Sequence, residues 1–225
     1  MNRLAIFDCD GTLVDSGHTI HHALNLAMAE QGLPALCPAA CRRIIGLSLV
    51  QAIAALLPAE SSERHVAIAE TYKAKFHAMR HAGEVSEPLF DGILDLLEAL
   101  EADGWLLAVA TGKSDRGLQL CLASHDIHAR FVSLQTSDRH PSKPHPSMAQ
   151  LAMSDAGAEP AATVVIGDTS YDMGMAKAAG AFGIGVTWGY HEPSELLASG
   201  AAAVADTPAD VLAIARELVG ASHER

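Results

Sequence analysis

Short apolar runs alternate with amphipathic stretches along most of this chain. Five runs of aliphatic and β-branched residues have the length of buried strands; they cover residues 4–7, 105–110, 131–134, 163–166 and 182–186. The stretches between them have helical periodicity, as from Ile93 to Leu100, a segment that Gly104 ends. Strands that alternate with helices predict a parallel sheet covered on both faces, a doubly wound, Rossmann-like α/β fold.

The segment from Ser16 to Glu87 breaks this alternation. It contains no convincing strand, and helical patterns follow one another with start signals at Pro38, Ser48 and Ser61 or Ser62. A helical block inserted after the first strand is typical of a lid. We therefore expect an α/β catalytic core of residues 1–15 and 88–225 and an inserted all-helical cap of residues 16–87, with hinges near residues 15–17 and 83–88.

Charge and composition narrow the choice of partners. The chain is 49% hydrophobic and 19% charged, which is typical of a globular protein. Its net charge of −12 argues against a surface that follows the phosphates of a nucleic acid. The apolar run after the N-terminus spans only residues 4–7, too few for a signal peptide or a membrane span. We expect a cytoplasmic protein that acts on a small molecule, with no nucleic-acid or membrane partner.

Two acidic residues, Asp8 and Asp10, directly follow the first predicted strand. Side chains alternate along an extended chain, so both carboxylates point the same way. Two carboxylates about 4 Å apart repel by roughly 4 kcal/mol at an effective dielectric of about 20, and Mg²⁺, which prefers oxygen ligands, would hold them together. An isolated pair is also compatible with a solvated acidic turn. A calcium loop of the EF-hand type is excluded, because Gly11 comes too early and a strand precedes the pair.

Polar residues also follow three later strands. Asp168 and Asp172 come after residues 163–166, although Asp168 alone could instead cap the next helix. Thr111 and Gly112 end the strand at 105–110 and offer a hydroxyl and free N–H groups near a helix start, which favours phosphate. Lys143 lies in a loop stiffened by three prolines. Open α/β sheets bind ligands at the carboxyl ends of their strands, so these strand ends predict one site.

Taken together and in this order, the motifs resemble those of the haloacid dehalogenase-like hydrolase superfamily. They are Asp8-Cys9-Asp10-Gly11-Thr12, Thr111-Gly112, Lys143-Pro144 and Gly167-Asp168 with Asp172. The helical insertion is similar to the cap of the subgroup that contains phosphoglycolate phosphatases, β-phosphoglucomutases and bacterial pyrophosphatases. The resemblance implies a Mg²⁺-dependent phosphatase that hydrolyses a small, phosphoglycolate-like phosphomonoester through an aspartyl-phosphate intermediate.

The resemblance also implies a role for each residue. Asp8 would be the nucleophile and Asp10 the general acid and base. Thr111, the N–H of Gly112 and Lys143 would hold the phosphoryl oxygens, and Lys143 would also steady Asp8. The expected magnesium ligands are Asp8, the carbonyl of Asp10 and Asp168, with Asp172 nearby, directly or through water.

The cap contributes candidate substrate contacts at the turn of residues 45–48. Similar caps reach into the active site there, so Gly46 and Ser48 are candidates. Arg43, beside the turn, would pair with a carboxylate such as that of phosphoglycolate.

Several alternatives share the core motifs. A phosphomutase similar to β-phosphoglucomutase and a pyrophosphatase both remain open. A dehalogenase or a phosphonate hydrolase would lack the acid at position 10, so Asp10 disfavours both, and the intact acids and Lys143 disfavour a non-catalytic binding protein. The segment Gly112-Lys113-Ser114 resembles the end of a P-loop, but Leu107 occupies the position that needs glycine.

Overall fold

Six parallel strands form a single sheet in the computed structural model, which describes residues 2–223. Their spatial order is β3-β2-β1-β4-β5-β6. The strands are β1 (Asn2–Phe7), β2 (Trp105–Thr111), β3 (Phe131–Thr136), β4 (Ala158–Gly167), β5 (Phe182–Val186) and β6 (Ala201–Ala205). The chain winds outward from β1 to β3 and then returns to β4 on the other side of β1, which puts the topological switch point between β1 and β4. The predicted doubly wound α/β fold is confirmed.

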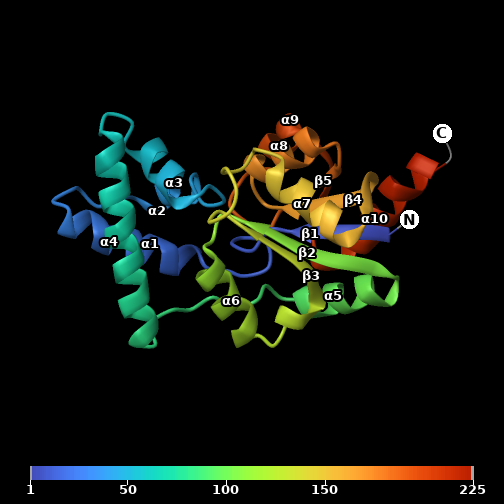
Figure 1. The fold of residues 1–225 in the computed structure, drawn as a ribbon, viewed down its shortest axis with the longest axis horizontal. Coiled ribbons are helices and arrows are strands. Elements are labelled where there is room, and N and C mark those ends of the chain that lie inside the picture. The colour runs from blue at the N-terminus through green and yellow to red at the C-terminus, as the bar shows by residue number, and fades with distance from the viewer. Residues whose placement is uncertain (1, 224–225) are drawn as a thin grey trace.

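Helices cover both faces of the sheet (Figure 1). One face packs against α5 (Ile93–Ala102), α6 (Asp115–Ser124) and α10 (Pro208–His223), and the other packs against α7 (Ser147–Ala156) and α8 (Ser170–Ala179). Side-chain alternation along β1 explains the division, since Ala5 and Phe7 belong to the first core while Leu4 and Ile6 belong to the second. The short η1 (His128–Arg130) precedes β3, and α9 (Pro193–Ser199) lies against β5 and β6.

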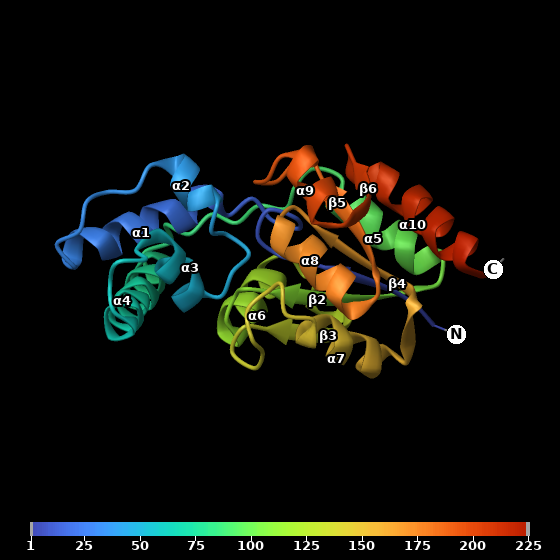
Figure 2. The ribbon, with the colours of Figure 1, turned by 90° about the horizontal axis from the view of Figure 1, so that it is seen from above.

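Four further helices stand apart from the sheet, beyond the carboxyl ends of its strands (Figures 1 and 2). They are α1 (Gly17–Glu30), α2 (Pro38–Arg42), α3 (Leu49–Leu56) and α4 (Ser62–His81). Two small apolar clusters hold them together, one around Leu24 and Ile44 and the other around Met28 and Ile68. This block is the all-helical insertion that the sequence predicts; the exact division at residues 16 and 87 stays a prediction.

Some of the serines that precede helices cap them with a side-chain hydrogen bond, and others do not. Ser114 and Ser61 cap α6 and α4, with their hydroxyls accepting from Gly117 N and Arg64 N. Ser48 precedes α3, but its side chain makes no capping hydrogen bond. The strand β6 is absent from the predicted set, because a run of alanines carries none of the β-branched residues that mark strands.

Across residues 2–223, no helix combines the length and the apolar character needed to span a bilayer.

Candidate active site

Asp8 is delivered to the switch point by β1. Its main-chain N–H donates to the carbonyl of Ile166 in β4 over 2.9 Å, which fixes the backbone between the two strands. Its side chain is buried, and Oδ1 lies 2.8 Å from Nζ of Lys143. The other oxygen, Oδ2, is buried without a hydrogen-bond partner among the residues that the structure describes. One carboxylate oxygen is therefore fixed by a cation and the other is available.

Asp168 and Asp172 lie beside Asp8. Each of the three residues offers a carboxylate oxygen within 4.8 Å of the other two. Asp168 accepts from Thr12 Oγ1 at 2.8 Å and from the N–H of Tyr190 at 3.0 Å. Gly11 has a φ of +88°, and a Cβ there would lie 2.3 Å from Asp168 Oδ2, so only glycine allows the loop after β1 to approach this carboxylate.

Asp172 holds two neighbours in place. Its Oδ1 accepts from Lys143 at 2.7 Å. Its Oδ2 accepts from the main-chain N–H and the hydroxyl of Thr169, which forms the capping box of α8. Asp172, at the start of α8, thus fixes Lys143 through one oxygen and the N-terminus of its own helix through the other.

The site carries more negative than positive charge. Burial raises the pKa of Asp8 to about 7, although Lys143 acts in the opposite direction. Burial and the neighbouring Asp8 and Asp172 raise the pKa of Asp168 well above its ordinary value. Burial alone would lower the pKa of Lys143. The neighbouring Asp172 and Asp8 carboxylates outweigh the effect of burial and raise this pKa above its usual range. One lysine faces three buried carboxylates, so full ionisation requires a further cation.

This arrangement fits a hard divalent cation. The ligands are carboxylate oxygens, which Mg²⁺ prefers, and the unpartnered Oδ2 belongs to the same group of acids. The side chain of Asp10 is not part of that group, so its predicted contribution through the main-chain carbonyl stays a prediction.

Thr111 and Gly112 lie at the end of the neighbouring strand. Phe7 of β1 pairs with Val109 of β2, so Asp8 and Thr111 emerge at the same edge of the sheet. Thr111 is buried, and its hydroxyl accepts from the N–H of Lys113 at 3.2 Å. Thr111 and Gly112 therefore lie at the same sheet edge as Asp8, and their binding of phosphate stays a prediction.

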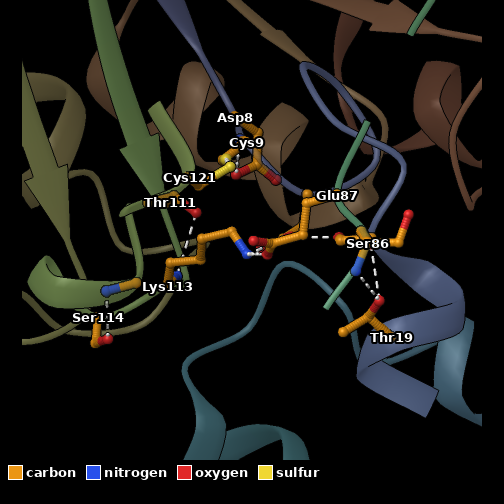
Figure 3. A network of polar contacts seen from close by, with 12 residues as sticks. Asp8, Cys9, Thr19, Ser86, Glu87, Thr111, Lys113, Ser114 and Cys121 are labelled. Atoms are coloured by element: carbon orange, nitrogen blue, oxygen red, sulfur yellow. Dashed lines mark hydrogen bonds and ion pairs between the residues drawn. The ribbon is translucent and has the colours of Figure 1, made fainter. Parts of the chain in front are cut away.

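Asp10 has partners that the sequence does not predict. Lys113 Nζ lies 2.8 Å from Asp10 Oδ1 and 2.6 Å from Glu87 Oε1, and Ser16 Oγ also donates to Asp10 Oδ1. Figure 3 shows the Lys113 side chain extended from the end of β2 toward Glu87. Although burial disfavours its charge, Asp10 and Glu87 raise the pKa of Lys113 well above its ordinary value. Lys113 therefore joins the Asp10 carboxylate to the linker between α4 and α5.

The sequence contains a partial signal for this network. A lysine directly after Thr111-Gly112 stands at a strand end that already carries candidate residues, so its side chain must lie at the same edge. Nothing local identifies Glu87 as its partner, because the two residues are 26 positions apart in the chain.

The three cap candidates have different environments. Gly46 and Ser48 line a pocket between cap and core, whereas Arg43 is not among its lining residues. The Arg43 guanidinium donates to both carboxylate oxygens of Glu195, at 2.7 and 2.6 Å. The main-chain N–H of Ser48 donates to Ser142 Oγ at 2.9 Å, and Tyr171 Oη donates to the Arg43 carbonyl at 2.9 Å. The turn is thus seated on the core.

Several known proteins are similar to this chain in sequence and in architecture. The family model described as haloacid dehalogenase-like hydrolase matches residues 5–186. A protein of Dickeya dadantii named probable phosphatase IndB is 37% identical over 223 residues, covering 97% of this chain and 96% of its own. A phosphoglycolate phosphatase of Haemophilus influenzae is 31% identical over 196 residues, covering 84% of this chain and 87% of its own. A solved structure described as a hydrolase from Pseudomonas syringae superposes with a TM-score of 0.83 at 26% identity, covering 96% of this chain and 99% of that one.

Proposed function

This chain belongs to the haloacid dehalogenase-like hydrolases and is a phosphoric monoester hydrolase, and from that membership we propose that it hydrolyses a small phosphomonoester through an aspartyl-phosphate on Asp8. Phosphoglycolate is the first candidate substrate, because several relatives carry the name phosphoglycolate phosphatase. The observation that carries the proposal is the Asp8 carboxylate, with one oxygen paired to Lys143 and the other unpartnered at the switch point of the sheet.

In the first step, an oxygen of Asp8 attacks phosphorus and forms an acyl-phosphate while the bond from phosphorus to the alcohol oxygen breaks. Asp10 donates the proton that the departing alkoxide needs. In the second step, Asp10 takes a proton from water as the water oxygen attacks phosphorus, which releases inorganic phosphate and regenerates the Asp8 carboxylate. Asp10 is therefore protonated again at the end of one turnover.

Lys143, Thr111 and the N–H of Gly112 bind the transferring group. Phosphoryl transfer depends on in-line positioning and on neutralising negative charge. The lysine is fixed by Asp172, so it donates from one place throughout the reaction. Thr111 is buried at the strand end and needs no rearrangement to reach the same edge.

Asp8, Asp168, the Asp10 carbonyl and Asp172, directly or through water, would hold Mg²⁺. When bound, the ion neutralises the phosphate oxygens and the carboxylates that surround them. The three side chains also hold Lys143 and the loop after β1, so their positions do not depend on the ion alone.

Substitution of Asp8 by asparagine tests the proposal. Asp8→Asn keeps the shape of the side chain but removes the nucleophile, so we expect release of inorganic phosphate to fall by at least about a thousandfold. Asp15→Asn is the matched control, because Asp15 is an exposed acid seven residues later. Near-normal phosphate release by folded Asp8→Asn would overturn the assignment. Transfer of phosphate to a second position of the substrate, with none released, would instead indicate a mutase.

A further inference from the structure

A pocket of about 520 Å³ opens beside Asp10, on the side where the leaving group of the proposed reaction departs. The cap contributes α1, the turn after α2 and α4, and the core contributes the residues after β2 and the start of α6. The contacts of Ser48 with Ser142 and of Tyr171 with Arg43 hold the cap against the core, so this volume is that of the seated cap.

The pocket is too large for glycolate. Glycolate has five non-hydrogen atoms, which occupy on the order of 150 Å³ at about 30 Å³ each, the share of a water molecule in the liquid. Phosphoglycolate would leave most of the pocket to water. A leaving group about three times as large would fill it.

Most of the exposed wall of the pocket is apolar. It is formed chiefly by Ile20, Leu24, Ile44, Leu47, Tyr72 and Phe76. The ring centroids of Tyr72 and Phe76 lie 5.7 Å apart on α4 with their planes tilted by 42°, so the two rings are neighbours in this wall. The Arg80 guanidinium lies over the Phe76 ring, 5.4 Å from its centroid. Such a wall removes water from a small carboxylate without replacing its hydrogen bonds, whereas it favours a planar ring.

The cations around the pocket offer little to a carboxylate. Lys113 is paired with Asp10 and Glu87, Arg80 with Glu87, and Lys73 with Glu70. Arg43 is paired with Glu195 and lies outside the lining. Within residues 2–223, Arg116 has no carboxylate partner, and its guanidinium meets His77 at 2.8 Å. It offers a planar set of donors at the polar edge of the pocket.

From the size, the aromatic wall and the polar edge, we infer that the substrate is the phosphomonoester of an alcohol that carries a planar ring. The ring packs on Phe76 and Tyr72, and hydrogen-bond acceptors on its edge face Arg116. This inference rests on the proposed phosphatase function and replaces phosphoglycolate, as candidate substrate, with ring-bearing phosphomonoesters.

Ethyl phosphate and 2-phenylethyl phosphate provide the test, because their leaving alkoxides have similar reactivity and only one carries a ring. We expect the ring to raise kcat/KM at least tenfold, and we expect 2-phenylethyl phosphate to exceed phosphoglycolate. A nucleoside 5′-monophosphate has a ring with hydrogen-bond acceptors on its edge, so its kcat/KM in wild type should exceed that of 2-phenylethyl phosphate. In Arg116→Gln this difference in kcat/KM should disappear. An advantage retained in Arg116→Gln would overturn the part assigned to the polar edge.

Phe76→Ala separates ring binding from general damage. It should raise KM for the ring substrates about tenfold and leave KM for ethyl phosphate within twofold. Val66→Ala is the control on the same helix, since Val66 is 48% exposed and does not line the pocket. Higher kcat/KM for phosphoglycolate than for every ring substrate, or equal KM increases for ring and ethyl substrates, would overturn the inference while leaving the phosphatase function intact.

A binding measurement keeps the inference testable if no phosphomonoester is hydrolysed, an outcome that would instead overturn the proposed function. In calorimetric titrations of Asp8→Asn, 2-phenylethyl phosphate should bind about tenfold more tightly than ethyl phosphate. Equal affinities would contradict a ring-binding pocket whether or not turnover occurs.

Discussion

At the scale of residues, Asp8 links the charge of the site to pH. Its pKa of about 7 in the metal-free protein lies above the value of 3.8 for an unperturbed aspartate. Between those values the folded chain keeps a proton that the unfolded chain has released. The stability that this proton provides is complete below about pH 4 and is lost as the pH rises through about 7.

Without Mg²⁺, we therefore expect the melting temperature to fall more steeply between about pH 5 and pH 8 in wild type than in Asp8→Asn, which cannot titrate at this position. Mg²⁺ added at about pH 8 should raise the wild-type melting temperature, because it supplies the charge that three buried carboxylates lack. Scanning calorimetry of both proteins measures the difference. Parallel pH curves for the two would contradict the assignment of this titration to Asp8.

Lys113 is expected to position Asp10. Lys113→Met keeps a long side chain but leaves Asp10 and Glu87 without the cation between them, so kcat should fall by about tenfold to a hundredfold. Glu87→Gln should have a smaller effect, and the double variant should lose less than the sum of the two, because the residues contact each other. Lys177→Met, on the exposed side of α8, is the control. Strictly additive losses would show that Lys113 and Glu87 act separately.

Residues of the site differ in how far the sequence reveals them. Asp8 and Asp168 directly follow apolar strands, so their meeting at one edge follows from strand order and could be predicted. Glu87 contacts Lys113 only because the linker between α4 and α5 folds back over the end of β2. This long-range contact has no local sequence pattern, so the sequence did not predict it. The ion pair of Arg43 with Glu195 was not predicted for the same reason, because the two residues are 152 positions apart in the chain.

At the scale of elements, the turn after α2 and the end of β2 are in direct contact. A Cβ on Gly112 would lie 2.5 Å from the carbonyl oxygen of Leu47 and 3.0 Å from that of Gly46. The absence of a side chain at Gly112 therefore allows the cap turn to reach the phosphate-binding strand end. Backbone atoms cannot yield as a flexible side chain can.

Gly112→Ala should displace this turn and lower kcat/KM for the preferred substrate by at least about tenfold. A phosphate ester without cap contacts, such as ethyl phosphate, should lose less. Gly220→Ala in α10 is the control, because a Cβ there meets nothing within 4 Å. Equal losses on both substrates would mean that the glycine serves only phosphate binding.

The edge strand β6 illustrates a second limit of prediction at this scale. Its sequence, Ala201 to Ala205, has one β-branched residue, and its burial is only partial. It forms because β5 offers an unpaired edge and α10 returns across the sheet. The other five strands carry their own apolar signal and need no such context.

At the scale of the whole molecule, the sheet supplies the chemistry and the cap supplies the walls around the leaving group. The ends of β1, β2 and β4 and the loop after β3 bring Asp8, Thr111, Asp168 and Lys143 to one edge, and the cap lies beyond that edge (Figure 2). Contacts between cap and core include Arg43 with Glu195, Ser48 with Ser142, Tyr171 with the Arg43 carbonyl, and Arg116 with His77. In the proposed reaction, a covered site would keep water away while the acyl-phosphate forms.

The covalent step on Asp8 is the central claim, and trapping the intermediate tests it most directly. Wild-type protein is mixed with a good substrate and Mg²⁺, quenched in acid within one turnover, digested and analysed by mass spectrometry. We predict that the peptide containing Asp8 gains the mass of one phosphoryl group, that fragmentation assigns it to Asp8, and that Asp8→Asn shows no such gain. Steady hydrolysis with no phosphorylated peptide at any quench time, or a phosphoryl group on another residue, would contradict the account.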